Sequence, residues 1–202
     1  ASMIIIFGGS FDPPHTGHNH IIQSLKKKYP IAKKIIIIPN KISPFKKDKS
    51  LQQEDLWNLC KLSFAELIDE QTLLSDIEIK NDDVSYTINT VKSIIAEYQN
   101  QKVFLCIGED SLIGLIYWYN FKELDLLIEK YIIIRRDSPY PQAVNFPNKY
   151  LENKSVVLNN DLWEISSTRL KAERNLNLSK QWLDPKVVAY LEKINWFKNE
   201  IG

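Results

Sequence analysis

The segment best suited to chemistry is Phe7–His18, whose sequence is FGGSFDPPHTGH. It holds three of the chain's six glycines and two histidines that flank the last of them. Gly8 and Gly9 let a ligand approach the backbone where a Cβ would clash, and a helix starting nearby would direct free N–H groups to the same place. His15 and His18, three residues apart, share one helical face and can donate hydrogen bonds to anionic oxygens. The segment therefore predicts a phosphate-binding loop.

Other interpretations of this segment are weaker. Zinc binding by the two histidines lacks a third ligand at helical spacing, and a purely structural turn does not need histidines on both sides of a glycine. The segment is not a Walker loop, because no Gly-Lys-Ser/Thr follows, and its glycine spacing differs from the dinucleotide-binding fingerprint. Asp12 could act as a general base, but we expect it to hold the loop by hydrogen bonds.

A second candidate phosphate site is the run Ile165-Ser166-Ser167-Thr168, which precedes a predicted helix. Hydroxyl groups and free amides at the start of a helix suit phosphate oxygens. An ordinary N-cap is the alternative, since Ser and Thr often provide one. Because the run accompanies the loop at 8–18, we favour the phosphate-binding role.

The elements that must position these residues alternate between isoleucine-rich strands and amphipathic helices. We predict strands at 3–7, 34–39, 73–79, 102–107, 131–135 and 155–158. We predict helices at 16–29, 51–69, 86–99, 110–117, 121–129, 167–176 and 185–195. A continuous apolar run such as Ile35–Ile38 is typical of a parallel strand that is covered on both faces. The expected fold is α/β, with a Rossmann-like, doubly wound, mostly parallel sheet and a small C-terminal helical portion.

The sheet also suggests where a ligand binds, because doubly wound folds bind ligands at the carboxyl ends of their strands. Gly108 and Asp110 end a predicted strand at this edge. Asp110 is a candidate for contact with a ribose hydroxyl or for the metal environment, and a helix N-cap would look the same in the sequence.

We expect one domain over residues 1–202, because no linker is long enough to separate two. Its Rossmann-like body would span about 3–160 and its C-terminal helical appendage about 161–202. The segment 136–154, which contains three prolines, is expected to be irregular.

Composition excludes several classes of protein. The 26 basic and 25 acidic residues give a net charge of +1, which creates no global field for nucleic acids or an anionic membrane. The apolar runs are far shorter than the roughly 20 residues that span a bilayer. Cys60 and Cys106 do not form a disulfide framework. We expect a cytoplasmic globular protein with no nucleic-acid or membrane partner, and both a monomer and a homo-oligomer are compatible with the sequence.

The chain resembles the nucleotidyltransferases of the His-x-Gly-His superfamily and, within it, bacterial nicotinate-mononucleotide adenylyltransferases. The resemblance rests on an ordered set of motifs: Gly8–His18, Ile38–Asn40, Pro44–Lys46, Ser85–Thr87, Ile107–Ser111, Trp118–Tyr119, Arg135–Arg136 and Ile165–Thr168. It implies an enzyme of NAD biosynthesis that joins nicotinate mononucleotide to the AMP moiety of ATP and releases pyrophosphate. Its partners would be ATP and nicotinate mononucleotide, and Mg²⁺ would bind mainly through the substrate phosphates.

The resemblance also assigns roles to individual residues. Phosphoryl transfer needs positioning and charge neutralisation, so no nucleophile from the protein is expected. The catalytic residues would be His15, His18 and Ser10. The residues that bind ATP and its phosphates would be Gly8, Gly9, Ser10, His18, Lys46, Gly108, Asp110, Ile165, Ser166, Ser167, Thr168 and Lys171. Nicotinate mononucleotide would bind to Asn40, Tyr86, Thr87, Trp118 and Tyr119.

At the substrate end, Trp118 would stack on the pyridinium ring, and the backbone amides of Thr87 and Tyr119 would donate to the nicotinate carboxylate. A nicotinamide NH₂ group would face these donors with another donor, which favours the acid over the amide. The alternative for Trp118 is core packing, because the chain has five tryptophans.

Three features leave alternatives open. Lys171 stands where the family usually has arginine, so it keeps the charge but loses the bidentate fork. Lys46 lies in the run Lys46–Lys49 and could be a solvated lysine. The alternative functions are another adenylyltransferase of the superfamily, acting on nicotinamide mononucleotide or phosphopantetheine, and a non-enzymatic nucleotide-binding module.

Overall fold

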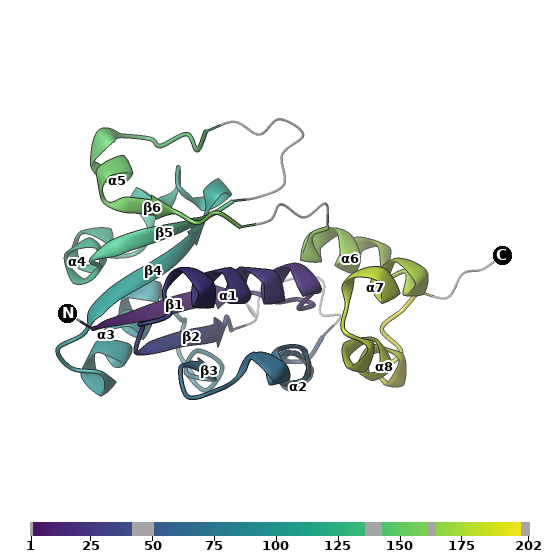
Figure 1. The fold of residues 1–202 in the computed structure, drawn as a ribbon. Helices are drawn as coiled ribbons and strands as arrows, with labels where there is room; N and C mark the ends of the chain where they lie inside the picture. The colour runs from purple at the N-terminus through teal and green to yellow at the C-terminus, as the bar shows by residue number, and fades with distance from the viewer. Residues whose placement is uncertain (1, 42–50, 136–142, 161–164, 199–202) are drawn as a thin grey trace.

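The computed structural model describes residues 2–41, 51–135, 143–160 and 165–198. The strands are β1 (Met3–Gly9), β2 (Lys34–Pro39), β3 (Thr72–Leu74), β4 (Lys102–Gly108), β5 (Lys130–Ile134) and β6 (Ser155–Val157). In this part of the chain they form one six-stranded sheet in the order β3-β2-β1-β4-β5-β6 (Figure 1). Every pairing is parallel. The chain order reverses between β1 and β4, as in a doubly wound sheet, and the predicted α/β fold is confirmed.

The helices in the described residues connect the strands and extend beyond the sheet at the C-terminal end. They are α1 (Thr16–Lys28), α2 (Gln53–Phe64), α3 (Thr87–Glu97), α4 (Phe121–Leu127), α5 (Lys149–Asn153), α6 (Ser167–Glu173), α7 (Leu176–Trp182) and α8 (Pro185–Lys193). Figure 1 shows α6, α7 and α8 together beyond the carboxyl ends of the central strands. None of the described helices is long and apolar enough to cross a membrane.

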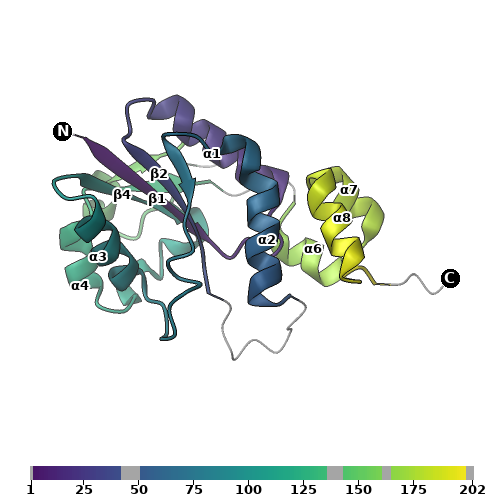
Figure 2. The ribbon, with the colours of Figure 1, turned by 90° about the horizontal axis from the view of Figure 1, so that it is seen from below.

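The isoleucine-rich strands separate two hydrophobic layers because successive side chains point to opposite faces of a sheet. Ile4 and Ile6 of β1 pack in a cluster with residues of α3 and α4. Ile5 and Phe7 pack on the other face, with residues of α1 and α2. In Figure 2, α1 lies on one side of the sheet and α3 and α4 lie on the other. The unbroken apolar runs in the sequence therefore reflect burial on both faces.

A third hydrophobic cluster joins the C-terminal helices to α2. Leu56 and Leu59 of α2 pack with Leu170 of α6 and with Val188 and Leu191 of α8. All five side chains are buried. Helix α2 also contributes Cys60 and Phe64 to the cluster beneath the sheet, so it links the sheet to the C-terminal helices.

The structure corrects two of the predicted elements. The segment 110–117, predicted as one helix, forms two 3₁₀ turns, Glu109–Ser111 and Leu115–Tyr117, with Gly114 between them. A glycine inside a helix is unfavourable by about 1 kcal/mol, which explains the interruption. The strand predicted at 73–79 ends at Leu74, and residues 77–80 form a turn.

Two further differences concern short helices. The segment 136–154 is predicted to be irregular, but its carboxyl end contains helix α5. The helix predicted at 167–176 ends earlier, because Arg174 adopts a left-handed conformation with φ of 42° and α7 begins after Asn175.

Candidate active site

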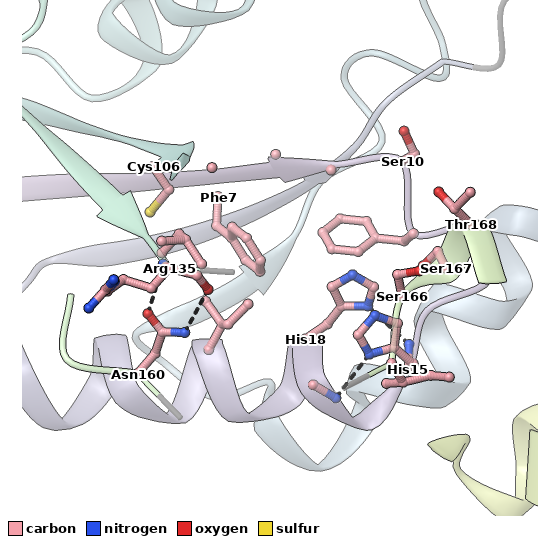
Figure 3. Close-up of a pocket in the computed structure, with 18 residues that line it drawn as sticks. Phe7, Ser10, His15, His18, Cys106, Arg135, Asn160, Ser166, Ser167 and Thr168 are labelled. Carbon is pink, nitrogen blue, oxygen red and sulfur yellow. Dashed lines mark hydrogen bonds between the residues drawn. The ribbon is translucent and has the colours of Figure 1, made fainter. Parts of the chain in front are cut away.

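A cavity of about 260 Å³ lies at the carboxyl ends of β1, β4 and β5 (Figure 3). Helix α1 and the start of α6 complete its walls. The described residues that line it are Phe7, Gly8, Gly9, Ser10, Phe11, His15, Gly17, His18, Ile21, Cys106, Gly108, Ile134, Arg135, Asn160, Ile165, Ser166, Ser167 and Thr168. This is the edge where the order of the strands reverses, which is the ligand-binding position of doubly wound folds.

The two histidines begin α1 by capping each other's backbone. The Gly17 N–H donates to Nδ1 of His15 at 3.0 Å, and the His15 N–H donates to Nδ1 of His18 at 3.0 Å. Together these bonds form a capping box, which satisfies two of the N–H groups that a helix leaves without partners at its start. The spacing His-x-x-His is therefore used by the helix itself.

These hydrogen bonds fix the chemical state of both rings. Because each Nδ1 accepts a hydrogen bond, the ring proton of His15 and of His18 is on Nε2. The two rings stack with their centroids 3.8 Å apart, a contact that two imidazolium cations would oppose by charge repulsion. Each histidine thus presents Nε2–H as its ring donor.

Gly8 and Gly9, which precede the histidines, differ in how much space a side chain would have. A Cβ on Gly9 would lie 2.9 Å from the ring of Phe11, whereas the nearest atom to a Cβ on Gly8 is Oδ1 of Asn40, at an ordinary 3.5 Å. Phe11 has a left-handed φ of 46° and a buried side chain. Its ring makes an edge contact with His18 at 4.9 Å. Gly9 therefore makes room for the aromatic ring that supports the second histidine.

Helix α6 is held against the loop that follows β1. Ser167 donates from Oγ to the carbonyl oxygen of Pro13 at 2.7 Å, and Ser166 caps α6 by accepting from the Arg169 N–H. Thr168 is exposed at the cavity (Figure 3). The Ile165–Thr168 run therefore combines a helix cap, a contact between segments and a hydroxyl that faces the cavity.

Lys171 has a partner in the same loop. Its Nζ lies 2.9 Å from Oδ2 of Asp12, and the side chains are 17% and 9% exposed. The other carboxylate oxygen of Asp12 is buried and has no hydrogen-bond partner among the residues that the structure describes. Lys171 does not line the cavity in the described structure, so its charge is directed to Asp12.

A second, smaller cavity of about 100 Å³ adjoins the first, and Gly8 and Cys106 line both. Its other described lining residues are Ile6, Ile38, Asn40, Glu78, Thr87, Thr90, Val91, Leu105 and Trp118. Both cysteines are buried free thiols. Burial raises the pKa of the Cys106 thiol, so this wall of both cavities is uncharged.

Two tyrosines stack outside the smaller cavity. The rings of Tyr86 and Tyr119 lie 4.3 Å apart and 30° from parallel, and both side chains are exposed. Each tyrosine is the neighbour in sequence of a cavity residue, Thr87 or Trp118. The stack therefore joins the two segments that bring Thr87 and Trp118 together.

The structure brings most of the predicted site residues to the two cavities. The larger cavity gathers Gly8, Gly9, Ser10, His15, His18, Gly108, Ile165, Ser166, Ser167 and Thr168, and the smaller gathers Asn40, Thr87 and Trp118. Among the predicted residues that the structure describes, four do not line either cavity: Tyr86, Asp110, Tyr119 and Lys171. Lys46 lies outside the described residues.

Several lining residues were given no site role from the sequence, among them Arg135, which was named only as part of a motif. Arg135 follows β5 and Asn160 follows β6, so the rule that placed Gly108 at the carboxyl edge would have found both. The Asn160 side chain accepts from the Arg135 N–H at 3.1 Å and donates to the Arg135 carbonyl at 3.2 Å. Glu78 and Thr90 of the smaller cavity carried no motif.

Comparison with known proteins shows the family to which the chain belongs. Residues 6–173 match the cytidylyltransferase-like family. The chain is 37% identical to a probable nicotinate-nucleotide adenylyltransferase of Fusobacterium nucleatum, covering 94% of this chain and 97% of that protein. It is 32% identical to a protein of Leptospira interrogans with the same name, covering 93% of each. The chain belongs to the nicotinate-nucleotide adenylyltransferase family.

Solved structures resemble this chain in fold. The nicotinic acid mononucleotide adenylyltransferase of Plasmodium falciparum, complexed with NaAD, superposes with a TM-score of 0.74 at 17% identity and covers 96% of this chain and 97% of its own. A putative nicotinate-nucleotide adenylyltransferase from Vibrio parahaemolyticus has a TM-score of 0.64 at 16% identity, with 98% of each chain covered. The resemblance identified from the motifs is confirmed.

Proposed function

We propose that this protein transfers the AMP moiety of ATP to nicotinate mononucleotide, giving nicotinate adenine dinucleotide and pyrophosphate, and that each cavity takes one substrate. The observation that carries the proposal is the pair of adjoining cavities that meet at Gly8 and Cys106. The larger is lined by N–H and hydroxyl donors, which suit a triphosphate. The smaller is lined by Trp118 and Thr87, which suit a pyridine ring that carries a carboxylate.

In the reaction, an oxygen of the mononucleotide 5′-phosphate forms a bond to the α-phosphorus of ATP. The bond from this phosphorus to the oxygen that bridges it to the β-phosphorus breaks, and pyrophosphate leaves with the electron pair. Positioning and electrostatic stabilisation carry such a transfer, so the protein need not form a covalent bond.

His15 and His18 stabilise the charge that develops on the phosphate oxygens. Their Nδ1 atoms are fixed as acceptors by the start of α1, so Nε2–H of each ring is the donor assigned to phosphate. A donor held in place before the reaction needs no reorganisation at the transition state. Ser10 and Thr168, which line the same cavity, add hydroxyl donors.

Nicotinate is held at the smaller cavity. The Thr87 N–H belongs to the first turn of α3, where amides lack partners within the helix. We assign it and the Tyr119 N–H to the nicotinate carboxylate, and we assign Trp118 to stacking on the ring. The stacked side chains of Tyr86 and Tyr119 support this site by fixing the two segments relative to each other.

Mg²⁺ enters this scheme with the triphosphate. None of the described residues that line the larger cavity is acidic. No group of three or more His, Cys, Asp or Glu side chains among the described residues could hold a metal ion. A cavity lined by N–H and hydroxyl groups fits a metal that is held mainly by phosphate oxygens and keeps some of its waters. Bound Mg²⁺ would neutralise the charge of the leaving pyrophosphate.

The test is pyrophosphate release from Mg-ATP with nicotinate mononucleotide, nicotinamide mononucleotide or phosphopantetheine as acceptor. We expect turnover with a strong preference for nicotinate mononucleotide. Equal rates with both pyridine mononucleotides would refute the role of the Thr87 and Tyr119 amides, and activity with phosphopantetheine alone would refute the proposed acceptor.

A further inference from the structure

The smaller cavity contains a carboxylate that the proposed mechanism does not use. Glu78 lies in the turn between β3 and α3, lines the cavity with Trp118, and is partly buried. Its Oε2 accepts a hydrogen bond from Oγ1 of Thr90 at 3.1 Å. Thr90 is a buried residue of α3 and lines the same cavity, so the carboxylate is held by a fixed element.

Glu78 has no cationic partner in the part of the chain that the structure describes. Lysines that contact residues around this turn have other partners, since Lys80 pairs with Asp76 at 3.1 Å and Lys41 donates to the carbonyl oxygen of Asn81. The other described residues that line the cavity are uncharged. A partly buried carboxylate without a counter-charge is unfavourable in the free protein.

The same burial perturbs the acid–base behaviour of Glu78. Desolvation raises the pKa of its carboxyl, and the hydrogen bond from Thr90 opposes this shift only in part. A carboxyl whose pKa is higher in the folded than in the unfolded protein makes folding less favourable as the pH rises through that interval. The free protein is therefore destabilised at neutral pH by a charge that a bound cation would compensate.

The pyridinium ring of nicotinate mononucleotide is such a cation. Its charge is permanent, because the ring nitrogen is bonded to ribose. Trp118, on the same cavity, attracts cations through the face of its indole ring. The ring nitrogen and the nicotinate carboxylate are meta to each other, so the amides of Thr87 and Tyr119 can hold the carboxylate while Glu78 faces the ring charge.

We propose that Glu78 is the counter-ion of the pyridinium ring, so that the smaller cavity selects its substrate by ring charge as well as by ring carboxylate. This inference rests on the proposed function. It assigns a specificity-determining role to a residue outside the recognised motifs. Mononucleotides with a neutral ring of the same shape are expected to be poor acceptors.

The experiment compares nicotinate mononucleotide with a neutral analogue in which a 3-carboxyphenyl group replaces the ring and is bonded to ribose through carbon. Glu78→Gln removes the charge and keeps an acceptor for the Thr90 hydroxyl. We expect KM for nicotinate mononucleotide to rise about 10-fold in this variant, as for the loss of a charge-assisted contact. The KM values for the neutral analogue and for ATP should stay near those of the wild type.

Thermal unfolding of the free protein separates this role from a structural one. If the charge of Glu78 has no counter-charge in the free protein, Glu78→Gln should raise Tm by about 2–4 °C. Glu70→Gln, at an exposed site outside both cavities, is the matched control and should change neither Tm nor KM. Glu78→Asp keeps the charge and should retain much of the preference for the charged ring.

The outcomes are distinct. If Glu78→Gln keeps the wild-type preference, or weakens both acceptors equally and lowers Tm, Glu78 only supports α3 and the inference is overturned. If the wild-type protein does not use nicotinate mononucleotide at all, the proposed function fails first and the assignment of Glu78 fails with it.

Discussion

At the scale of single residues, His15 and His18 each have two tasks on one ring. Nδ1 accepts a backbone N–H and starts α1, while Nε2–H is the donor that we assign to phosphate. A fixed ring presents its donor in one direction, which is the property that electrostatic catalysis requires. The helix cap therefore holds in place the donors to which we assign a catalytic role.

The two tasks can be separated by substitution at His18. His18→Asn removes the donor at Nε2, but Oδ1 of Asn is as many bonds from the backbone as Nδ1 of His and can accept the His15 N–H. We expect turnover to fall on the order of 100- to 1000-fold with little change in Tm. His18→Ala should lose similar activity and also about 1 kcal/mol of stability. Pyrophosphate release and thermal unfolding measure the two effects.

His20→Ala is the control for this series, because His20 lies on the same helix and does not line either cavity. Near-wild-type turnover in His18→Asn would mean that His18 serves only as a cap, and the catalytic role would have to be withdrawn.

At the scale of elements, α6 and the loop after β1 are joined by two contacts. One is the hydrogen bond from Ser167 to Pro13, and the other is the ion pair between Lys171 and Asp12. The loop leads into the start of α1, where His15 and His18 lie, and Ser166 and Thr168 lie at the start of α6. These contacts therefore set the distance between the two groups of donors that we assign to phosphate.

A double-mutant cycle tests whether Lys171 acts through Asp12. Lys171→Met leaves a buried carboxylate without its cation and should cost about 3 kcal/mol. Asp12→Asn should relieve this cost, so the double variant should be more stable than Lys171→Met. Urea unfolding measures the coupling free energy.

Lys171→Arg, which preserves the charge, serves as the reference for this cycle. Additive losses of stability, combined with a rise in KM for ATP confined to the Lys171 variants, would instead favour direct contact between Lys171 and the triphosphate.

The elements also show what the sequence could predict. Runs such as Ile35–Ile38 fix a buried parallel strand because both of its faces are covered. The segment 110–117 has apolar residues at helical spacing, but Gly114 disfavours a continuous helix, and the segment forms two 3₁₀ turns instead. The partner of Lys171 could not be predicted, because Asp12 is 159 positions away and no local pattern reports such a contact.

Some residues of the candidate site could likewise be predicted from the sequence, whereas others could not. His15, His18 and Gly108 follow from local patterns, namely a strand, a turn and the start of a helix. Glu78 could not be found from the sequence because its place in the smaller cavity depends on how the turn after β3 packs against α3. An isolated glutamate in a polar turn looks like a solvated residue until the fold surrounds it.

At the scale of the whole molecule, α2 joins the sheet to the C-terminal helices through shared hydrophobic contacts. We propose that the chain is one folding unit, and we expect it to unfold in a single transition. Leu191→Ala, at a fully buried site on α8, should lower the stability of the entire chain by about 2–5 kcal/mol. Far-UV circular dichroism and tryptophan fluorescence, followed in urea, should report the same midpoint.

The matched control is Leu126→Ala, the same substitution at a site that is 86% exposed, and its effect should stay within about 0.5 kcal/mol. Two separate midpoints, with only the later helices affected by Leu191→Ala, would show that the C-terminal helices unfold independently.

The contacts between α6 and the loop after β1 also order events during translation. A ribosome releases the N-terminal part of a chain first. The loop after β1 is therefore made long before the residues of α6 that hold it. Until α6 emerges, Asp12 has no lysine beside it and the Pro13 carbonyl lacks the Ser167 hydroxyl. A nascent chain that has not reached α6 therefore lacks both contacts that hold the loop after β1 in place.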